Sequence, residues 1–501
     1  MTGKDFGQLI YKLRKDRKLT QFSLGGLVGV TDKAVSKWER EGIIPQMDVL
    51  LRLADALNVD ARIFLGDEDP NIPLEGPDLI WRREELWQTA EKRLYDLYGP
   101  EVPLPVLSRF GKEMSRLAGS NALIIFDIVR EISKAAEAQN TLFEGPPSLY
   151  GSLTAWLMQA STINPLPAHY RCPGCHKTEF HPEMRCGWDL PEKRCECGEK
   201  MERNGHDIPF EAIACGNSSP CDSGEYYIGA SILEEAQKII LRKAGPYFTL
   251  RRYARTTEEG DPSFTLIFLD AKDENQKTPD YIEDIRRVEN VYNWGTSTSY
   301  AAFRFLPCRE PKRTGRKAKP RTPTISDLVQ EEVLVRTLKA FNEGNEEQKE
   351  FYGVDFTIRD PELYRKGITF GKLVTLFCSM KNAWMEENAE AMAEAVGFDD
   401  LTKMPSSLED IWQLIHRCAA GTANPADLDG IADMIVMRCA RGGYINDMTE
   451  TDIALFRRLN LPEWFPEYVK RIISICYRSE ITMEAFRMAK IQWQRMQIDR
   501  S

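Results

Sequence analysis

Four cysteines in two close pairs are the residues of this chain whose types and spacing point most directly to chemistry. Two residues separate Cys172 from Cys175, and one residue separates Cys195 from Cys197. Seven of the 12 cysteines lie between residues 172 and 221. Four thiolates in two close pairs are the ligand set of a closed tetrahedral zinc site, which stabilises a fold and leaves no open position for catalysis. The spacing therefore predicts a structural Zn²⁺ site.

The length and composition of the chain set the context for these cysteines. At 501 residues the chain is too long for one hydrophobic core, so we expect about three domains. No apolar run approaches 18 residues, and the first residues lack the apolar segment of a signal peptide. We therefore expect a cytoplasmic protein with no membrane span. In that compartment thiols stay reduced, which favours a metal site over disulfides.

The charge of the chain is unevenly distributed. The whole chain carries a net charge of −10, but residues 1–66 hold 11 Lys and Arg against 8 Asp and Glu. The acidic excess therefore belongs to the remainder of the chain. A basic head on an acidic body favours nucleic-acid binding that is confined to the head.

Residues 1–66 show the pattern of a small helical domain. A short helix is predicted from Thr20 to Val28, and the next begins after Thr31, a residue type that caps helix N-termini. On this second helix Val35 and Trp38 should face the core. Two short helices around a glycine-containing turn are typical of a helix-turn-helix.

The head resembles the Cro/C1-type, or Xre-like, helix-turn-helix family over its full length. The resemblance rests on Leu19-Thr20-Gln21, Gly29-Val30-Thr31 and Val35-Ser36-Lys37-Trp38-Glu39. It implies binding to double-stranded DNA, with Gln21 and Lys37 on phosphates and the start of the second helix at base edges, and it implies a homodimer on two half-sites. The DNA-binding residues that it implies are Gln21, Thr31, Asp32, Lys33, Ser36 and Lys37. The alternative is a helical bundle that serves only as an interaction domain.

The body, from residue 80 onward, resembles the alpha subunit of the C-type replicative DNA polymerase III of Gram-positive bacteria. The resemblance is carried by Cys172-Pro173-Gly174-Cys175, by Gly205-His206-Asp207-Ile208-Pro209-Phe210-Glu211 and by Ser223-Gly224-Glu225-Tyr226. It implies a polymerase palm with a zinc knuckle and a helical fingers region. A Gly-Ser pair ahead of the cysteines, Gly151-Ser152, stands where the family grips the triphosphate, although such a pair is more often only a turn.

The second cysteine pair departs from that family, in which two residues separate the second pair. This departure leaves the fourth ligand open. Cys186 is close enough to serve as the alternative, and His176, His181 and His206 are further candidates. The other interpretation is that these thiols are free, buried or degenerate.

The catalytic motif of the family is missing. The family places an Asp-x-Asp pair ahead of its Ser-Gly-Glu-Tyr run, and these positions fall on Asn217 and Ser219 here. Nucleotidyl transfer needs carboxylates that hold two Mg²⁺ ions. We therefore expect no catalytic Mg²⁺ and no enzymatic activity. The remaining candidates for a metal-binding carboxylate are Asp222, in a shifted register with Glu225, and Asp355.

A basic run between residues 311 and 323 is the strongest in the chain, and it lies where the family has a Lys-Arg-Thr motif. Two interpretations carry equal weight, a nucleic-acid contact and a solvated loop. The residues that would contact nucleic acid are Lys312, Arg313, Arg316 and Lys317.

These observations predict a multidomain protein. An all-α helix-turn-helix head precedes an α+β palm-like core with a zinc knuckle and a mostly α-helical fingers-like C-terminal region. The predicted boundaries are 1–66 for the head, 67–79 for a Pro-rich acidic linker, 80–170 for a helical segment, 171–211 for the knuckle, 212–366 for the palm-like region and 367–501 for the fingers-like region. The linker should let the head move partly independently.

The expected function is that of a DNA-binding regulator of transcription or replication whose polymerase-like body is catalytically inactive. One alternative is a replication inhibitor or decoy that binds replisome partners. Another is a residual DNA polymerase with a relocated metal site. Through its body the protein would contact replisome proteins or single-stranded DNA.

Overall fold

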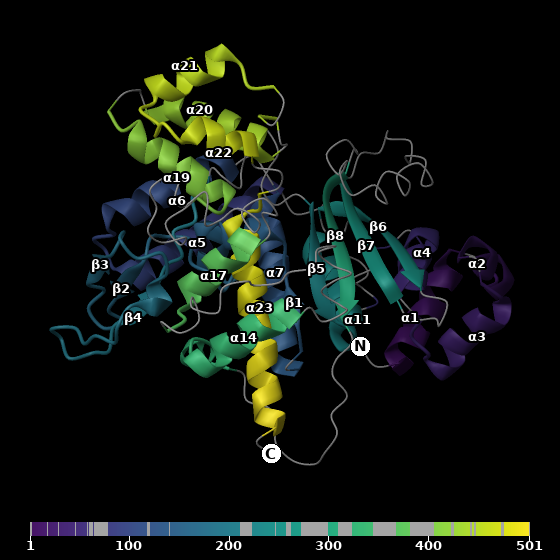
Figure 1. Cartoon of the computed structure of the whole chain (residues 1–501). Coiled ribbons are helices and arrows are strands. Elements are labelled where there is room, and N and C mark those ends of the chain that lie inside the picture. Colours follow the sequence, from purple (N-terminus) through teal and green to yellow (C-terminus); the bar gives the residue numbers. More distant parts are fainter. Residues whose placement is uncertain are drawn as a thin grey trace. The chain divides into compact units, whose positions relative to one another are not determined.

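In a computed structural model of the chain, the described residues form many helices and two sheets (Figure 1). It describes residues 3–17, 19–28, 30–45, 47–57, 59, 64, 79–117, 121–139, 141–210, 223–245, 247–256, 262–271, 299–308, 323–343, 367–380, 405–421, 425–440, 443–444, 447–471 and 475–499. The chain forms two compact units. The first comprises Met1–Thr89, Ser120–Gly145 and Cys221–Thr314, and the second comprises Ala90–Gly119, Pro146–Pro220 and Gly315–Ser501. The boundaries predicted from sequence run along the chain and do not follow these interleaved units, and they stay predictions.

The head lies in the first unit and contains the predicted pair of short helices. Its helices are α1 (Gly3–Asp16), α2 (Gln21–Val28), α3 (Asp32–Glu41) and α4 (Met47–Leu57). The Thr31 side chain accepts a hydrogen bond from the backbone N–H of Ala34, which confirms Thr31 as the cap of α3. Val35 and Trp38 are buried, as predicted.

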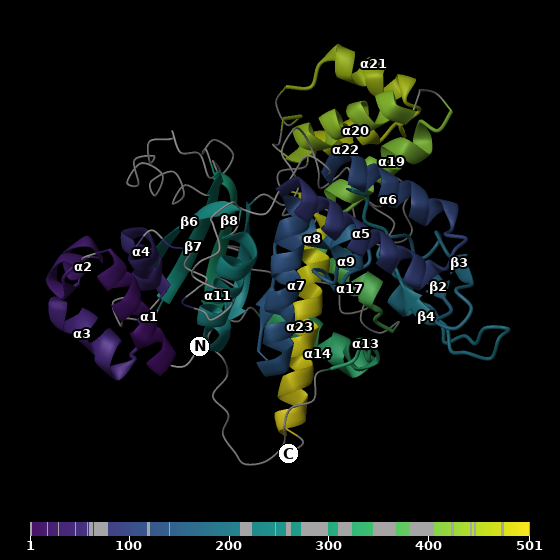
Figure 2. The same ribbon diagram turned by 180° about the vertical axis from the view of Figure 1, so that it is seen from behind.

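A five-stranded sheet forms the centre of the first unit. Its order is β1-β5-β8-β7-β6, in which β5 and β8 are parallel and the other neighbours are antiparallel. The strands are β1 (Phe143–Glu144), β5 (Ser223–Gly229), β6 (Phe248–Thr256), β7 (Pro262–Ala271) and β8 (Ser299–Cys308). The helix α11 (Leu233–Ala244), which follows the short 3-10 turn η3 (Ala230–Ile232), lies against the sheet, in front of β8 in Figure 2. It also packs against α7 (Ala122–Gln139).

The core of the head includes one side chain from this part of the unit. Leu241 of α11 is buried among the apolar side chains of α1–α4, and Leu250 of β6 packs against the same cluster. The head therefore shares part of its core with α11 and β6 of the same unit, although the linker composition favours partial independence.

In the second unit a small three-stranded sheet precedes the C-terminal helices. Its order is β3-β2-β4, and both pairs are antiparallel. The strands are β2 (His169–Arg171), β3 (Thr178–Phe180) and β4 (Glu202–Asn204), and the 3-10 turn η2 is Gly187–Asp189. The helices ahead of the sheet are α5 (Leu79–Tyr98, which runs on from the first unit), α6 (Leu104–Leu117), α8 (Pro147–Tyr150) and α9 (Leu153–Leu157).

The described residues after 323 are mostly helical, in line with the mostly α-helical C-terminal region that was predicted. The long helix α23 packs against α8, α13, α14 and α17, as Figure 1 shows for α14 and α17. The helices are α13 (Ile325–Leu328), α14 (Glu331–Glu343), α17 (Phe370–Met380), α19 (Leu408–Cys418), α20 (Pro425–Ala440), α21 (Glu450–Arg458), α22 (Phe465–Arg471) and α23 (Arg478–Asp499). Among the described residues, no helix combines the length and the apolar character needed to cross a bilayer.

Candidate functional site

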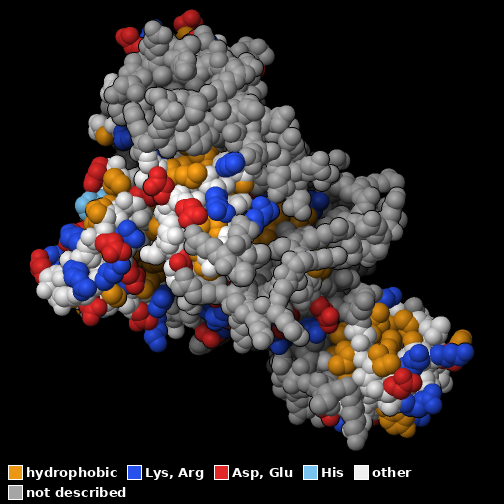
Figure 3. Space-filling model, turned by 60° about the horizontal axis from the view of Figure 1, so that its bottom comes forward, with side chains coloured by type: hydrophobic (Ala, Val, Ile, Leu, Met, Phe, Trp, Pro, Cys, Tyr) orange, Lys and Arg blue, Asp and Glu red, His pale blue; other side chains and the backbone are white. Residues whose placement is uncertain are grey.

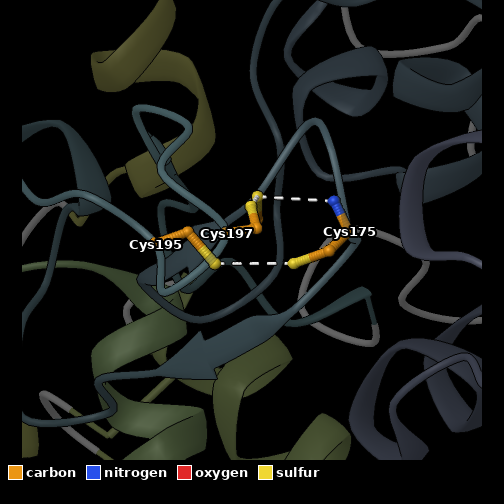
Figure 4. Close-up of side chains that lie close together, drawn as sticks. Cys175, Cys195 and Cys197 are labelled. Carbon is orange, nitrogen blue, oxygen red and sulfur yellow. Dashed lines mark hydrogen bonds between the residues drawn. The ribbon is translucent and has the colours of Figure 1, made fainter.

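The four cysteines of the two predicted pairs come together at one end of the small sheet. The sulfur atoms of Cys172, Cys175, Cys195 and Cys197 all lie within 4.8 Å of one another. The Sγ atoms of Cys172 and Cys197 are 3.4 Å apart. Those of Cys175 and Cys195 are also 3.4 Å apart and point toward each other in Figure 4. In a tetrahedral site with Zn–S bonds of about 2.3 Å, neighbouring sulfurs are about 3.8 Å apart. The four-cysteine cluster therefore has the size that a metal such as zinc requires.

Two tight turns bring the pairs together. The first follows β2, where the backbone N–H of Cys175 donates to the Cys172 sulfur over 3.5 Å. The second precedes β4, where the N–H of Gly198 donates to the carbonyl of Cys195. Gly198 has a φ of 93°, a backbone conformation that glycine adopts without strain, directly after Cys197. Because β2 pairs with β4, the two turns lie at the same end of the sheet.

The pKa values of the cluster thiols indicate that neighbouring thiolates oppose one another's ionisation. The N–H of Cys175 lowers the pKa of Cys172 to about 6. The N–H of Glu199 would by itself lower the pKa of Cys197, but the neighbouring thiols of Cys172, Cys195 and Cys175 raise it to about 12. One thiolate forms readily and further ones are opposed by their neighbours. A bound divalent cation would remove this repulsion.

The apolar core around the cluster is small. It comprises Tyr170, Cys172, Leu190, Cys195 and Met201, with Met184 packed against it. The surface around it carries mixed charge, with Lys177 paired to Glu196 and Lys200 to Glu192; Figure 3 shows Lys, Arg, Asp and Glu side chains interspersed at the left-hand edge. Small domains with so few apolar contacts commonly depend on a metal or disulfides.

The alternative ligands lie outside the cluster. Cys186 is buried, and its sulfur is 3.7 Å from Nδ1 of His206, which is itself buried against Trp188. Burial raises the pKa of the Cys186 thiol and lowers the pKa of His206 to about 3. Nδ1 of His176 lies 3.0 Å from the Leu97 carbonyl, and Nδ1 of His181 lies 2.8 Å from Glu183. The structure thus groups Cys197 with the other three cysteines and places Cys186 outside the cluster, and the ligand set stays a prediction.

The predicted DNA-reading residues form an exposed face at the start of α3. Thr31, Asp32, Lys33 and Lys37 are exposed, and Ser36 is half-buried. In Figure 3 the head, at the lower right, carries Lys and Arg side chains beside exposed hydrophobic ones. The described face thus has cations for phosphates and short polar groups for base edges.

Gln21 is directed into the head. Its Nε2 donates to Oε2 of Glu39 over 2.8 Å, and Nε of Arg14 donates to Oε1 of the same carboxylate over 2.5 Å. The Arg14 and Glu39 side chains are only 6% and 3% exposed, so this ion pair ties α1 to α3 inside the head. Gln21 thus supports α3 through Glu39, and its predicted phosphate contact stays a prediction.

The Glu39 carboxylate should make the stability of the head depend on pH. Burial alone would raise the pKa of Glu39, but hydrogen bonds from Arg14 and Gln21 bring it below its ordinary value of 4.5. A lowered folded-state pKa means that the stabilisation is present above the unfolded pKa and is lost as the pH falls through the folded pKa. We expect the urea concentration at which half of the head is unfolded to decrease as the pH is lowered below about 4.5. The unfolding is followed by fluorine NMR of labelled Trp38. Glu39→Gln should flatten this dependence, and an equally steep fall in that variant would contradict the assignment.

The Gly-Ser pair ahead of the cysteines binds an internal carboxylate. Glu113 of α6 is fully buried and accepts hydrogen bonds from Oγ of Ser152 and from the backbone N–H groups of Leu153 and Thr154, each over 2.9 Å. Nε of Arg109 donates to the same carboxylate over 2.5 Å. Sequence reasoning missed Glu113, although a glutamate on the apolar face of a predicted helix was a usable signal.

The other candidates lie outside the described residues or are paired. Outside the described residues are Asn217, Ser219, Asp222, Asp355, Lys312, Arg313, Arg316 and Lys317. Glu225, the proposed companion of Asp222, faces Arg304 across the parallel strands β5 and β8, with 2.7 Å between Oε1 and Nη1. The structure therefore leaves the two carboxylate candidates as predictions.

Comparison with known proteins identifies the head. Residues 10–64 match the family model described as Helix-turn-helix. The head is an Xre-like helix-turn-helix domain. This match begins within α1 and includes α2, α3 and α4, so the resemblance of the head is confirmed.

A second region is similar to replicative polymerases. The chain is 36% identical over 143 residues to the DNA polymerase III PolC-type of Bacillus subtilis (strain 168), which is 28% of this chain and 10% of that protein. It is 35% identical over 140 residues to the protein of the same description from Lacticaseibacillus paracasei, again 10% of that protein. The protein from Thermotoga petrophila is 32% identical over 141 residues. The chain thus spans about a tenth of the length of the curated relatives that it matches.

This similarity corrects one expectation. We expected no enzymatic activity because Asn217 and Ser219 stand at the places of the catalytic aspartates. Several relatives at 32–36% identity are DNA polymerases, and that finding contradicts the expectation. The absence of one motif at one alignment register was too narrow a basis, because metal-binding carboxylates can come from other strands of a palm.

Proposed function

We propose that this protein binds double-stranded DNA through its helix-turn-helix head and acts on DNA synthesis at that site through its polymerase III-like region. The observation that carries the proposal is the presence of both features in one chain, namely a family match at residues 10–64 and similarity to PolC-type polymerases over 27–28% of the chain. In this proposal the head selects the DNA, and the protein is a cytoplasmic regulator of, or participant in, replication.

DNA binding by the head is testable with single lysines. Lys33→Ala and Lys37→Ala should each weaken binding to a DNA site selected from a random pool by about 10- to 100-fold, because each removes a contact of about 1–3 kcal/mol. Lys134→Ala, an exposed lysine of α7, is the matched control. Affinities are measured by fluorescence anisotropy at fixed salt. Equal losses in the control, or no loss at Lys33 and Lys37, would exclude this face.

Primer extension tests the second arm. We expect extension of a primed template with Mg²⁺ or Mn²⁺ and all four nucleotides, since transfer by polymerases requires carboxylate-bound divalent cations. Asp222→Ala should abolish it if Asp222 holds a metal. A lack of extension by the wild-type protein would refute polymerase activity and leave binding to DNA and replisome proteins as the role of the body. Extension that survives Asp222→Ala would show that residues other than Asp222 hold the catalytic metal.

We further propose that the four-cysteine cluster holds a structural Zn²⁺. The convergence of four sulfurs within 4.8 Å supports a metal site, and the choice of zinc rests on the preference of this ion for four thiolates. All four ligand positions would be filled by protein. The ion would then stabilise the fold and take no part in nucleotidyl transfer.

A further inference from the structure

The chain between the two cysteine pairs contains a turn whose side chains contact the C-terminal helices. This turn, residues 185–190, includes the 3-10 turn η2, and we call it the docking turn. We propose that metal binding at the four-cysteine cluster controls the docking of α17, α19 and α23, because the docking turn is anchored at the cluster. The inference rests on the proposed metal site and goes beyond it by naming what the metal regulates.

The first contact caps a helix. Oδ1 of Asp189 accepts the backbone N–H of Phe370 over 2.9 Å, and Oδ2 accepts that of Gly371 over 2.8 Å. These donors belong to the first turn of α17, whose partial positive charge favours a carboxylate. A Cβ atom at position 371 would lie 2.9 Å from Oδ2 of Asp189, so a side chain there would displace the carboxylate that caps α17. The docking turn therefore fixes the start of α17.

The second contact is aromatic. Trp188 is buried, and its ring centroid lies 4.9 Å from that of Phe370 in α17 and 5.6 Å from that of Phe486 in α23. Its other neighbour, His206, is 4.3 Å away and belongs to the segment that follows β4. One side chain of the docking turn thus joins two C-terminal helices to the knuckle.

The third contact is an ion pair. Nη1 of Arg185 lies 3.4 Å from Oδ1 of Asp410 in α19, and it donates to Oγ1 of Thr375 in α17 over 3.4 Å. Next to the knuckle, Gln413 of α19 donates to both the carbonyl and the carboxylate of Asp207. Three helices from distant parts of the sequence are therefore held by residues that lie between or just after the cysteine pairs.

The docking turn is tied to the cluster by packing. Leu190, its last residue, belongs to the same small core as Cys172 and Cys195. A metal bound to four thiolates closes the loop between Cys175 and Cys195, which restricts the conformations of every residue inside it. Loss of the metal would free the loop and with it the cap, the tryptophan and the arginine. By thermodynamic linkage, docked helices would also strengthen metal binding.

Hydrogen exchange of the full-length protein tests this coupling. Zinc content is measured first, and the Zn²⁺-loaded protein is then compared with protein stripped by a chelator. After stripping, we expect exchange in α17, α19 and α23 to become at least about tenfold faster, while exchange in α1–α3 of the head stays unchanged. A tenfold faster exchange corresponds to a decrease of about 1.4 kcal/mol in the free energy of opening. Faster exchange confined to residues 172–204 would overturn the coupling alone. Failure to bind Zn²⁺ would overturn both the metal site and the coupling.

A variant separates the docking turn from the metal. Trp188→Ala, loaded with Zn²⁺, should keep its zinc content while exchange in α17 and α23 rises as it does on stripping. Trp87→Ala, which changes a partly exposed tryptophan of α5, is the matched control and should leave both helices protected. If Trp188→Ala leaves α17 and α23 as protected as in the wild type, the docking role is refuted. If that variant is too unstable, Asp189→Asn tests the cap on α17 with a smaller change in volume.

Discussion

Cys197→Ser is expected to lose Zn²⁺ and to unfold the region between β2 and β4. The sulfur of Cys197 lies 3.4 Å from that of Cys172, on the exposed side of the cluster, so its removal breaks the tetrahedral set without emptying the apolar core. Binding of structural Zn²⁺ by small peptides is worth about 10–16 kcal/mol. Changes in groups that only support a ligand cost about 10- to 100-fold in metal affinity, so loss of a ligand should cost more than about 100-fold.

The matched control is Cys186→Ala. Cys186 is buried between the same two pairs but faces His206, so this variant should keep one Zn²⁺ per chain. Zinc is measured by mass spectrometry after dialysis against a competing chelator, and folding is followed by the hydrogen exchange of residues 169–204. If Cys197→Ser retains zinc, or if Cys186→Ala loses it, Cys186 and not Cys197 is the fourth ligand.

Glu113→Ala is expected to destabilise the contact between α6 and α9 by about 3–5 kcal/mol, the usual cost of removing one partner of a buried charged network. The change would leave Arg109 without its carboxylate and would leave the Ser152 hydroxyl and two backbone N–H groups unsatisfied in a buried place. Glu113→Gln keeps the shape of the side chain but places an amide N–H₂ group against hydrogen-bond donors. We therefore expect it to be less stable than the wild type and more stable than Glu113→Ala.

Native-state hydrogen exchange of residues 153–158 gives the free energy of opening for this contact. Glu137→Ala, at an exposed glutamate in the last turn of α7, is the control and should change that free energy by less than about 0.5 kcal/mol. If Glu113→Ala and the control behave alike, the Glu113 carboxylate is not what holds the Gly-Ser turn.

The features that sequence reasoning predicted well are those that depend on neighbours in the chain. The cap at Thr31 and the burial of Val35 and Trp38 follow from helical periodicity and from residues that start or end helices. The four cysteines could be assigned to one metal site because two closely spaced pairs are the usual ligand set of such a site. The one-residue spacing of the second pair left Cys186 open as an alternative ligand, since sequence spacing does not show which way a side chain points.

The features that were missed join residues far apart in the sequence. Glu113 meets Ser152 about 40 positions away, and Asp189 meets Phe370 about 180 positions away. Nothing in local composition selects such partners. The expectation of an inactive body failed for a related reason, because it treated one short alignment as if it showed where all carboxylates of a palm must lie.

By itself the sequence determined that the chain begins with a basic helix-turn-helix head and carries four thiols able to hold a metal. Both are local patterns, and their physical basis is helix periodicity, capping and thiolate chemistry. Only the tertiary structure decided that Leu241 completes the core of the head, that Glu113 occupies the Gly-Ser turn, and that Trp188 and Asp189 hold the C-terminal helices. These contacts bury apolar area and satisfy charges between distant segments, and such pairings are chosen by the packing of the whole chain.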